Sequence, residues 1–219
     1  MTDFSENIGI LGGTFDPVHE GHLAMARLVL QRQLVDRILF IPAAKPVHKQ
    51  APAAGFEHRF AMLKLMVTDE QGMSVSRVER ELAGPSYTIR TVRELMRRNE
   101  KARFTMIIGA DSLLELHRWY RHEELLALVA WIVAARADIT AAQVTQAIAL
   151  LGGTPVVENS PHHTFLLPGG HTLAYLADFS CQAASSNLRM KPQQRDMLAS
   201  AVHAYIRRHR LYGLSGEQQ

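Results

Sequence analysis

Short apolar runs alternate with stretches of helical periodicity along most of the chain. The apolar runs have the length and composition of strands buried on both faces, and they fall at residues 7–11, 37–42, 73–78, 103–109 and 130–135. Apolar positions recur at helical spacing over residues 21–34, 57–68, 86–98 and 141–151. Strands that alternate with helices in this way predict an α/β fold with a doubly wound, mostly parallel sheet and helices on both of its faces.

The chain shows no feature that would divide it. It contains no internal repeat, no low-complexity tract and no linker rich in Pro, Gly or Ser, so residues 1–219 are predicted to form a single domain. Residues 154–178 contain only short strand-like pieces. An amphipathic helix is predicted over residues 193–209, within a closing helical part at about 185–212. One face of this helix carries Met197, Ala201, Val202, Tyr205 and Ile206.

Composition narrows the class of protein. The chain is 47% hydrophobic and 21% charged, which is ordinary for a soluble domain, and no apolar run approaches the ~20 residues of a membrane span. The N-terminal segment lacks the basic and apolar regions of a signal peptide, and the single cysteine, Cys181, excludes an internal disulfide. A net charge of +3 is too small to indicate nucleic acid as a partner. We therefore expect a cytoplasmic protein; a homo-oligomer is compatible with the sequence, which does not decide the oligomeric state.

Three segments follow directly after predicted strands. Residues 12–22 follow the first strand, Asp111 follows the fourth and Arg136 follows the fifth. In open α/β sheets ligands bind outside the carboxyl ends of the strands. We therefore expect these three positions to meet in one cleft.

The segment after the first strand, GGTFDPVHEGH, carries the most specific chemistry. Gly12 and Gly13 lack a Cβ and let the backbone approach a bulky anion, and the N-terminus of the following helix offers N–H groups to a phosphate. His19 and His22 can donate hydrogen bonds to the oxygens of a phosphate under attack, as phosphoryl and nucleotidyl transfer require. A glycine turn alone, or a histidine pair alone, is weak evidence for a phosphate-binding catalytic site. The two together in one segment are a far more specific signal. The segment is neither a Walker A loop nor a G-x-G-x-x-G loop.

These residues resemble the H-x-G-H nucleotidyltransferase superfamily and, within it, the bacterial nicotinate mononucleotide adenylyltransferases. The resemblance covers nearly the whole chain and rests on segments in the same order. They are GGTFDPVHEGH at 12–22, PVHK at 46–49, SYT at 86–88, IGADS at 108–112, HRW at 117–119 and SSNLR at 185–189. The resemblance implies a Rossmann-like fold and an enzyme of NAD biosynthesis. Such an enzyme transfers the AMP part of ATP to the phosphate of nicotinate mononucleotide, which forms nicotinate adenine dinucleotide and pyrophosphate.

The resemblance also implies roles for individual side chains. It implies that His19, His22 and Arg189 are catalytic, the histidines at the α-phosphate of ATP and Arg189 at the leaving pyrophosphate. ATP and phosphate binding would fall to Gly12, Gly13, Thr14, Phe15, Asp111, Ser185 and Ser186. Mononucleotide binding would fall to Lys49, Thr88, Trp119 and Arg136, with Trp119 against the pyridine ring and Arg136 at the phosphate. Mg²⁺ is expected with ATP, shared among phosphates and without a cluster of protein carboxylates.

Departures from the family pattern concern mainly the acceptor. Ala183-Ala184, Arg90 and Ala137-Asp138 stand where the family usually has Ile-Ser, Asp and Pro-Gly. Another H-x-G-H adenylyltransferase or cytidylyltransferase stays an alternative, as does a nucleotide-sensing protein that binds without turnover. The sequence also leaves open how strongly nicotinate is preferred over nicotinamide mononucleotide.

Overall fold

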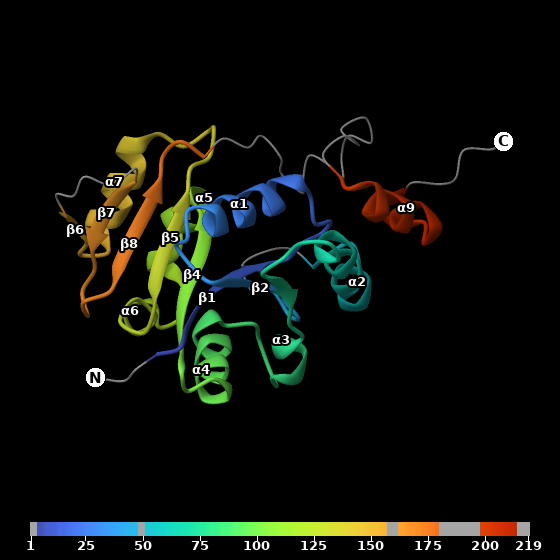
Figure 1. Cartoon of the computed structure of the whole chain (residues 1–219), viewed down its shortest axis with the longest axis horizontal. Coiled ribbons are helices and arrows are strands. Elements are labelled where there is room, and N and C mark those ends of the chain that lie inside the picture. Colours follow the sequence, from blue (N-terminus) through green and yellow to red (C-terminus); the bar gives the residue numbers. More distant parts are fainter. Residues whose placement is uncertain (1–3, 48–50, 157–161, 180–197, 214–219) are drawn as a thin grey trace.

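The computed structural model describes residues 4–47, 51–156, 162–179 and 198–213 (Figure 1). Its strands are β1 (Glu6–Gly13), β2 (Arg37–Pro42), β3 (Met73–Val75), β4 (Ala102–Gly109), β5 (Ala130–Ala134), β6 (Thr154–Val156), β7 (His163–Leu166) and β8 (Thr172–Leu176). Its helices are α1 (Glu20–Gln31), α2 (Phe56–Val67), α3 (Val78–Glu81), α4 (Thr88–Arg98), α5 (Ala110–Leu114), α6 (His122–Leu126), α7 (Ala141–Leu150) and α9 (Ser200–Arg208). Two 3₁₀ turns, η1 (Leu116–Arg118) and η3 (Leu211–Gly213), complete the described elements.

All described strands join one sheet of order β3-β2-β1-β4-β5-β8-β7-β6. The strands from β3 to β8 in this order are parallel, whereas β7 and β6 pair antiparallel at one edge. The predicted α/β class with a mostly parallel, doubly wound sheet is therefore confirmed. β1 lies between β2 and β4, and the chain builds the sheet outward from it in both directions.

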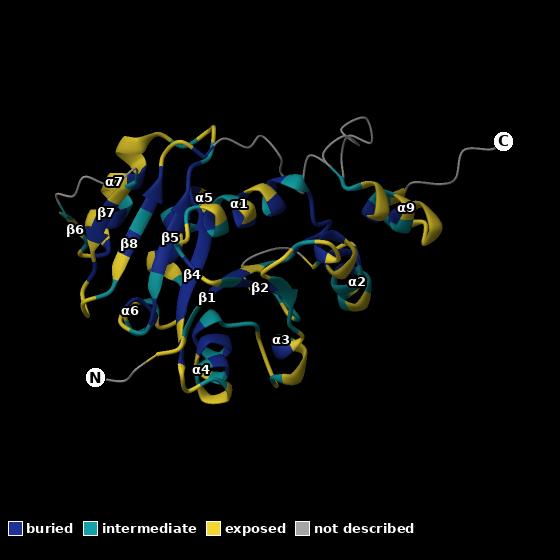
Figure 2. Cartoon of the chain, viewed as in Figure 1, coloured by how far each residue is buried: buried dark blue, intermediate teal, exposed yellow. Residues whose placement is uncertain are grey.

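Helices cover both faces of the sheet because successive residues of the central strands send apolar side chains to opposite sides. Ile8 and Ile10 join the core under α3, α4, α5, α6 and α7, whereas Leu11 joins the core under α1, α2 and α9. Figure 2 shows the central strands buried and the outer sides of α4, α7 and α9 exposed. Gly9 faces the second core, where a Cβ would lie 2.7 Å from Cδ1 of Ile107, so a side chain there would require Ile107 to shift.

One predicted element needs correction, and the structure adds detail in two other places. The strand predicted over residues 73–78 ends at Val75, because Ser76 Oγ accepts the N–H of Val78 at 3.2 Å and α3 begins there. α6 was not predicted, since its single turn is too short for a helical repeat to show. The short strand-like pieces expected in residues 154–178 are confirmed as β6, β7 and β8, which pair antiparallel. The turn between β7 and β8 places Gly169 and Gly170 at positive φ, where glycine is favoured.

The closing helical part packs on α2 through α9. Val202 and Ile206 are buried and Tyr205 is half-buried, as the amphipathic pattern predicts, but Ala201 is exposed, contrary to prediction. Met197 lies outside the described residues. The prediction that residues 1–219 form a single domain stays a prediction.

Candidate active site

The candidate site lies at the carboxyl ends of β1, β4 and β5. The chain turns toward one edge of the sheet after β1 and toward the other through β4, and ligands of α/β sheets bind at such a switch point. As the sequence predicts, the residues that follow these strands meet there. Arg136 Nε donates to Oδ1 of Asp111 at 3.2 Å, and the positive charge of Arg136 acts on the imidazole of His19.

His19 and His22 form a reciprocal cap at the N-terminus of α1. His19 is the N-cap residue, and its Nδ1 accepts the backbone N–H of Gly21 at 3.2 Å. In return, Nδ1 of His22 accepts the backbone N–H of His19 at 3.2 Å. This arrangement is a capping box with imidazoles in place of the usual hydroxyl and carboxylate, and it explains the spacing of three residues between the histidines.

The cap also fixes where each neutral imidazole carries its proton. Because Nδ1 of both rings accepts an N–H, it holds no proton, so the proton of each neutral ring lies on Nε2. The two ring centroids are 3.8 Å apart, with an angle of 34° between the planes. His19 and His22 can therefore present two neighbouring Nε2–H donors to a single ligand.

His19 is only 2% exposed, and its burial is the main cause of a pKa lowered from 6.5 to about 4. The positive charge of Arg136 lowers this pKa further. Both effects disfavour the imidazolium form, so His19 is neutral at pH 7 in the free protein. An anion between Arg136 and the histidines would meet one fixed charge and two neutral donors.

The loop from Gly12 to Phe15 offers its backbone to the site. Gly12 is exposed, and a Cβ there would meet no atom within 4 Å, so its open side faces solvent. Phe15 is buried, and its ring contacts the ring of His22 edge-on at a centroid distance of 4.9 Å. The ring of Phe15 thus packs against the ring of His22 in the protein interior. Because this ring is buried, Phe15 would meet a phosphate through its backbone.

Asp111 belongs to the first turn of α5, and its side chain does not cap that helix. The N-cap is Gly109, which makes no side-chain cap, and the Asp111 carboxylate instead accepts from Arg136. A Cβ on Gly109 would lie 2.4 Å from Oδ1 of Asp111 and 2.9 Å from Nε of Arg136. The ion pair therefore occupies the space that a side chain at position 109 would need.

The residues expected at the pyridine ring lie on two neighbouring segments. Thr88 begins α4 and Trp119 follows η1, and the residues beside them, Tyr87 and Tyr120, bring their rings to a centroid distance of 4.6 Å. Trp119 is half-buried and meets Trp131 edge-on at 6.5 Å, so one part of its indole belongs to the core.

The remaining predicted site residues cannot be placed. Lys49, Ser185, Ser186 and Arg189 lie outside the described residues, as do Ala183 and Ala184. The side chain of Arg90 reaches back toward Gly84, where a Cβ would lie 2.8 Å from its Nη1, in the turn that precedes α4.

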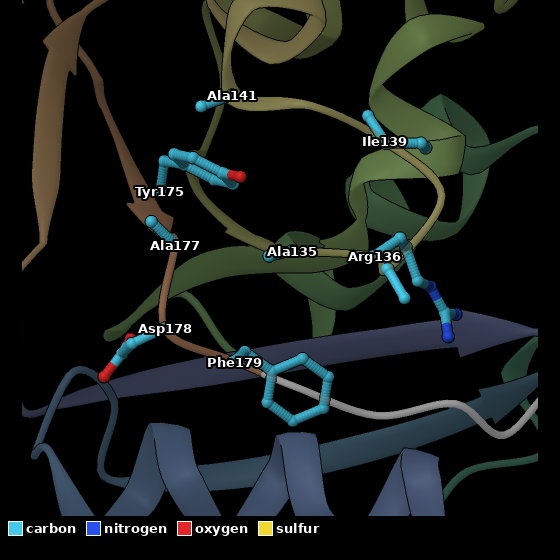
Figure 3. A pocket seen from close by; sticks show the side chains of 9 residues that line it. Ala135, Arg136, Ile139, Ala141, Tyr175, Ala177, Asp178 and Phe179 are labelled. Atoms are coloured by element: carbon cyan, nitrogen blue, oxygen red, sulfur yellow. The ribbon is translucent and has the colours of Figure 1, made fainter.

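A pocket of about 330 Å³ opens beside Arg136, between the carboxyl ends of β5 and β8 (Figure 3). Its wall includes the rings of Tyr175 and Phe179 and the side chain of Ile139. Burial raises the pKa of the Tyr175 hydroxyl. The pocket thus joins an apolar wall to the guanidinium of Arg136, a combination suited to the ring and the phosphate of a nucleotide.

The structure also shows polar contacts that sequence reasoning missed. Glu79 accepts from the backbone N–H of Ala44 at 3.2 Å and from the hydroxyl of Thr91 at 2.9 Å. Ser86 and Lys45 bond reciprocally: the Lys45 N–H donates to Oγ of Ser86 at 2.8 Å and the Ser86 N–H to the Lys45 carbonyl at 3.1 Å. These bonds tie the loop after β2 to the turn before α4. No sequence pattern announces them, because their acceptors and donors are largely backbone groups.

In the described part of the chain, no helix has the length and apolar character needed to cross a membrane. Within the same residues, no three His, Cys, Asp or Glu side chains gather in a group that could hold a metal ion.

Comparisons with known proteins show what this chain is similar to. Residues 10–200 match the family model described as cytidylyltransferase-like. A "probable nicotinate-nucleotide adenylyltransferase" of Synechococcus sp. (strain JA-3-3Ab) is 40% identical over 212 residues, which cover 94% of this chain and 94% of that protein. A protein of the same description from Gloeobacter violaceus is 37% identical, over 94% of this chain and 96% of its own. Among solved structures, nicotinic acid mononucleotide adenylyltransferase of Plasmodium falciparum, complexed with NaAD, has a TM-score of 0.75 at 16% identity and covers 96% of this chain and 98% of its own, which shows a shared fold.

Proposed function

The chain belongs to the cytidylyltransferase-like family and, within it, to the nicotinate-nucleotide adenylyltransferases, and from this premise we propose that it transfers AMP from ATP to nicotinate mononucleotide. The products are nicotinate adenine dinucleotide and pyrophosphate, in the synthesis of NAD. A phosphate oxygen of the mononucleotide forms a bond to the α-phosphorus of ATP. The bond from that phosphorus to the bridging oxygen breaks, and pyrophosphate leaves with the electron pair.

The observation that carries the proposal is the fixed orientation of the two imidazoles. Each Nδ1 is engaged by a backbone N–H, so His19 and His22 direct Nε2–H groups to one ligand. We assign both donors to the α-phosphate, whose oxygens gain negative charge in the transition state. No general base is required, since a phosphate monoester is largely ionised near neutral pH and is itself the nucleophile.

The acceptor would bind on the side of Arg136. In this proposal the guanidinium, oriented by Asp111, holds the phosphate of the mononucleotide within reach of the α-phosphorus. In this proposal Thr88 and Trp119 bind the pyridine ring, and Lys49 adds positive charge. Gly12, Gly13, Thr14 and Phe15 would meet ATP through their backbones. Ser185, Ser186 and Arg189 complete the proposal at the β- and γ-phosphates.

The residues present suit Mg²⁺ that arrives with ATP. Asp111 supplies one carboxylate at the site, and Mg²⁺ commonly takes most of its ligands from phosphates and water. When bound, the ion would neutralise charge on the phosphates. We place this reaction in the cytoplasm, a reducing compartment that suits a chain with one cysteine.

The test is pyrophosphate release from ATP and Mg²⁺ with nicotinate mononucleotide, with nicotinamide mononucleotide, and with no acceptor. Rapid release with the nicotinate form, slower release with the nicotinamide form and none without acceptor would support the proposal. Binding of ATP without release under any condition would point instead to a sensing protein. Release with neither mononucleotide but with another phosphorylated acceptor would overturn the assigned substrate.

A further inference from the structure

Arg59, on α2, is 1% exposed, and its guanidinium donates to backbone carbonyls of separate loops. Its Nη1 donates to Thr14 at 2.7 Å, its Nη2 to Ala43 at 2.8 Å and its Nε to Ala54 at 3.1 Å. Thr14 follows β1, Ala43 follows β2, and Ala54 precedes α2. One planar side chain thus holds the loops around the candidate site from the side of the core.

Asp16 completes this network from the opposite direction. It is buried, and its carboxylate accepts the backbone N–H groups of Ala53 at 2.8 Å and Ala54 at 3.0 Å. Ala54 is therefore held at its N–H by Asp16 and at its carbonyl by Arg59. The hydroxyl of Tyr212, in η3, donates to the same carboxylate at 2.7 Å and so ties the closing part of the chain to the phosphate loop.

Burial and the charge of Asp16 have opposite effects on Arg59. Burial lowers the pKa of Arg59, while the attraction of Asp16, the first of its electrostatic partners, raises it. A buried cation is expensive unless it is compensated and hydrogen-bonded, and here both conditions are met. A smaller apolar side chain could fill this part of a core. A guanidinium is needed here because it hydrogen-bonds and orients three carbonyls.

The carbonyl of Thr14 connects this network to the chemistry. In a planar trans peptide the C=O and the next N–H point in opposite directions, so the bond from Arg59 also sets the direction of the Phe15 N–H. Among the described residues this N–H has no acceptor. Phe15 has a φ of 51°, a left-handed conformation that a bulky residue holds only when its surroundings impose it. The ring of Phe15 in turn supports His22.

We infer that Arg59, with Asp16 and Tyr212, is a positioning residue for the adenylyl transfer. It touches no substrate; it fixes the Thr14–Phe15 peptide and, through the ring of Phe15, the imidazole of His22. This inference rests on the proposed function. Because a displacement of about 1 Å at the reacting groups can cost ~100-fold in rate, a positioning role predicts a loss in kcat that exceeds the loss in substrate binding.

The test compares Arg59→Lys with Tyr212→Phe, and uses Thr140→Ala as the matched control. Lysine keeps the charge but cannot reach three carbonyls as a planar fork, and phenylalanine removes only the hydroxyl that donates to Asp16. Thr140 caps α7, so its loss lowers stability without touching the network. The measurements are kcat and KM for pyrophosphate release and the melting temperature of each variant. The kinetic assays are run well below the lowest melting temperature, so that every variant is fully folded.

We expect Arg59→Lys to lower kcat about 30-fold and Tyr212→Phe about threefold, with KM for ATP changed less than threefold in each. The double variant should lose less than the product of the single losses, because both changes act on one network. Thr140→Ala should keep its kcat. If wild type releases pyrophosphate while both network variants keep kcat within a factor of about 1.5, Arg59 is merely structural. Should Arg59→Lys fail to fold, the kcat of Tyr212→Phe alone tests the positioning role, by the same limits. A wild type without release contradicts the proposed function instead.

Discussion

Replacing His19 by Asn would separate the two roles that we assign to this side chain. His19 caps α1 through Nδ1 and presents Nε2–H to the α-phosphate. Asparagine is among the best N-cap residues, and its side-chain oxygen can accept the Gly21 N–H, but its shorter side chain cannot also reach the position of Nε2. We therefore expect His19→Asn to fold with an intact α1 and to lose most of its activity.

The expected magnitudes follow from the contacts. Loss of one preorganised donor to a developing oxyanion costs about 2.7–4 kcal/mol, or a 10²–10³-fold fall in kcat. His19→Ala should show the same fall in kcat and lose in addition about 1 kcal/mol of unfolding free energy, because the cap of α1 disappears. In a chain of this size that difference corresponds to a melting temperature about 2–4 °C below that of His19→Asn.

The assay is steady-state pyrophosphate release with saturating ATP and nicotinate mononucleotide, combined with thermal unfolding of both variants. A His19→Asn enzyme whose kcat stays within threefold of wild type would refute the donor role. Equal stability of the Asn and Ala variants would refute the cap.

Three further predictions concern neighbouring groups. Because the pKa of His19 is about 4 in the folded protein and 6.5 in the unfolded chain, the unfolded state binds more protons between these values. The His19 contribution to stability is complete above pH 6.5 and falls by about 3 kcal/mol toward pH 4; chemical unfolding at several pH values should show a smaller loss in His19→Asn. Gly109→Ala should displace the pair of Asp111 and Arg136 and raise KM for the mononucleotide about tenfold or more, seen in kinetics with ATP saturating, whereas an unchanged KM would show that the pair does not meet the acceptor. Thr140→Ala should cost about 1 kcal/mol of unfolding free energy in denaturant titration and leave kcat unchanged; a loss of activity would show that α7 influences the site.

Much of the fold could be predicted because its signals are local. Buried parallel strands appear as continuous apolar runs, and the strand predicted over residues 37–42 matches β2 at both ends. The meeting of the loop after β1 with Asp111 and Arg136 followed from one rule about parallel sheets. The short helices α3 and α6 were not predicted. The turn that begins α3, for example, depends on a single bond from the Val78 N–H to Oγ of Ser76.

The candidate site could be predicted only in part. The spacing of His19 and His22 was visible, but the reason for it, a reciprocal cap that sets the tautomer, required the backbone geometry. Arg59 was not singled out, because its partners are carbonyls of residues up to 45 positions away and carbonyls leave no mark in a sequence. Asp16 was not singled out either, and its bond to Tyr212 spans 196 positions. Long-range contacts with backbone atoms are thus where sequence reasoning stopped.

The central claim is that two neutral imidazoles, each with its proton on Nε2, receive the α-phosphate. The most direct test is to measure the ¹⁵N chemical shifts of His19 and His22 at pH 7, assigned with single-histidine variants, in the free protein and with a non-hydrolysable ATP analogue and Mg²⁺. The account predicts the Nε2–H tautomer for both rings in the free protein, with the Nε2 shifts moving when the analogue binds. An Nδ1–H tautomer or an imidazolium at His19 in the free protein, or Nε2 shifts unchanged at saturation, would contradict it.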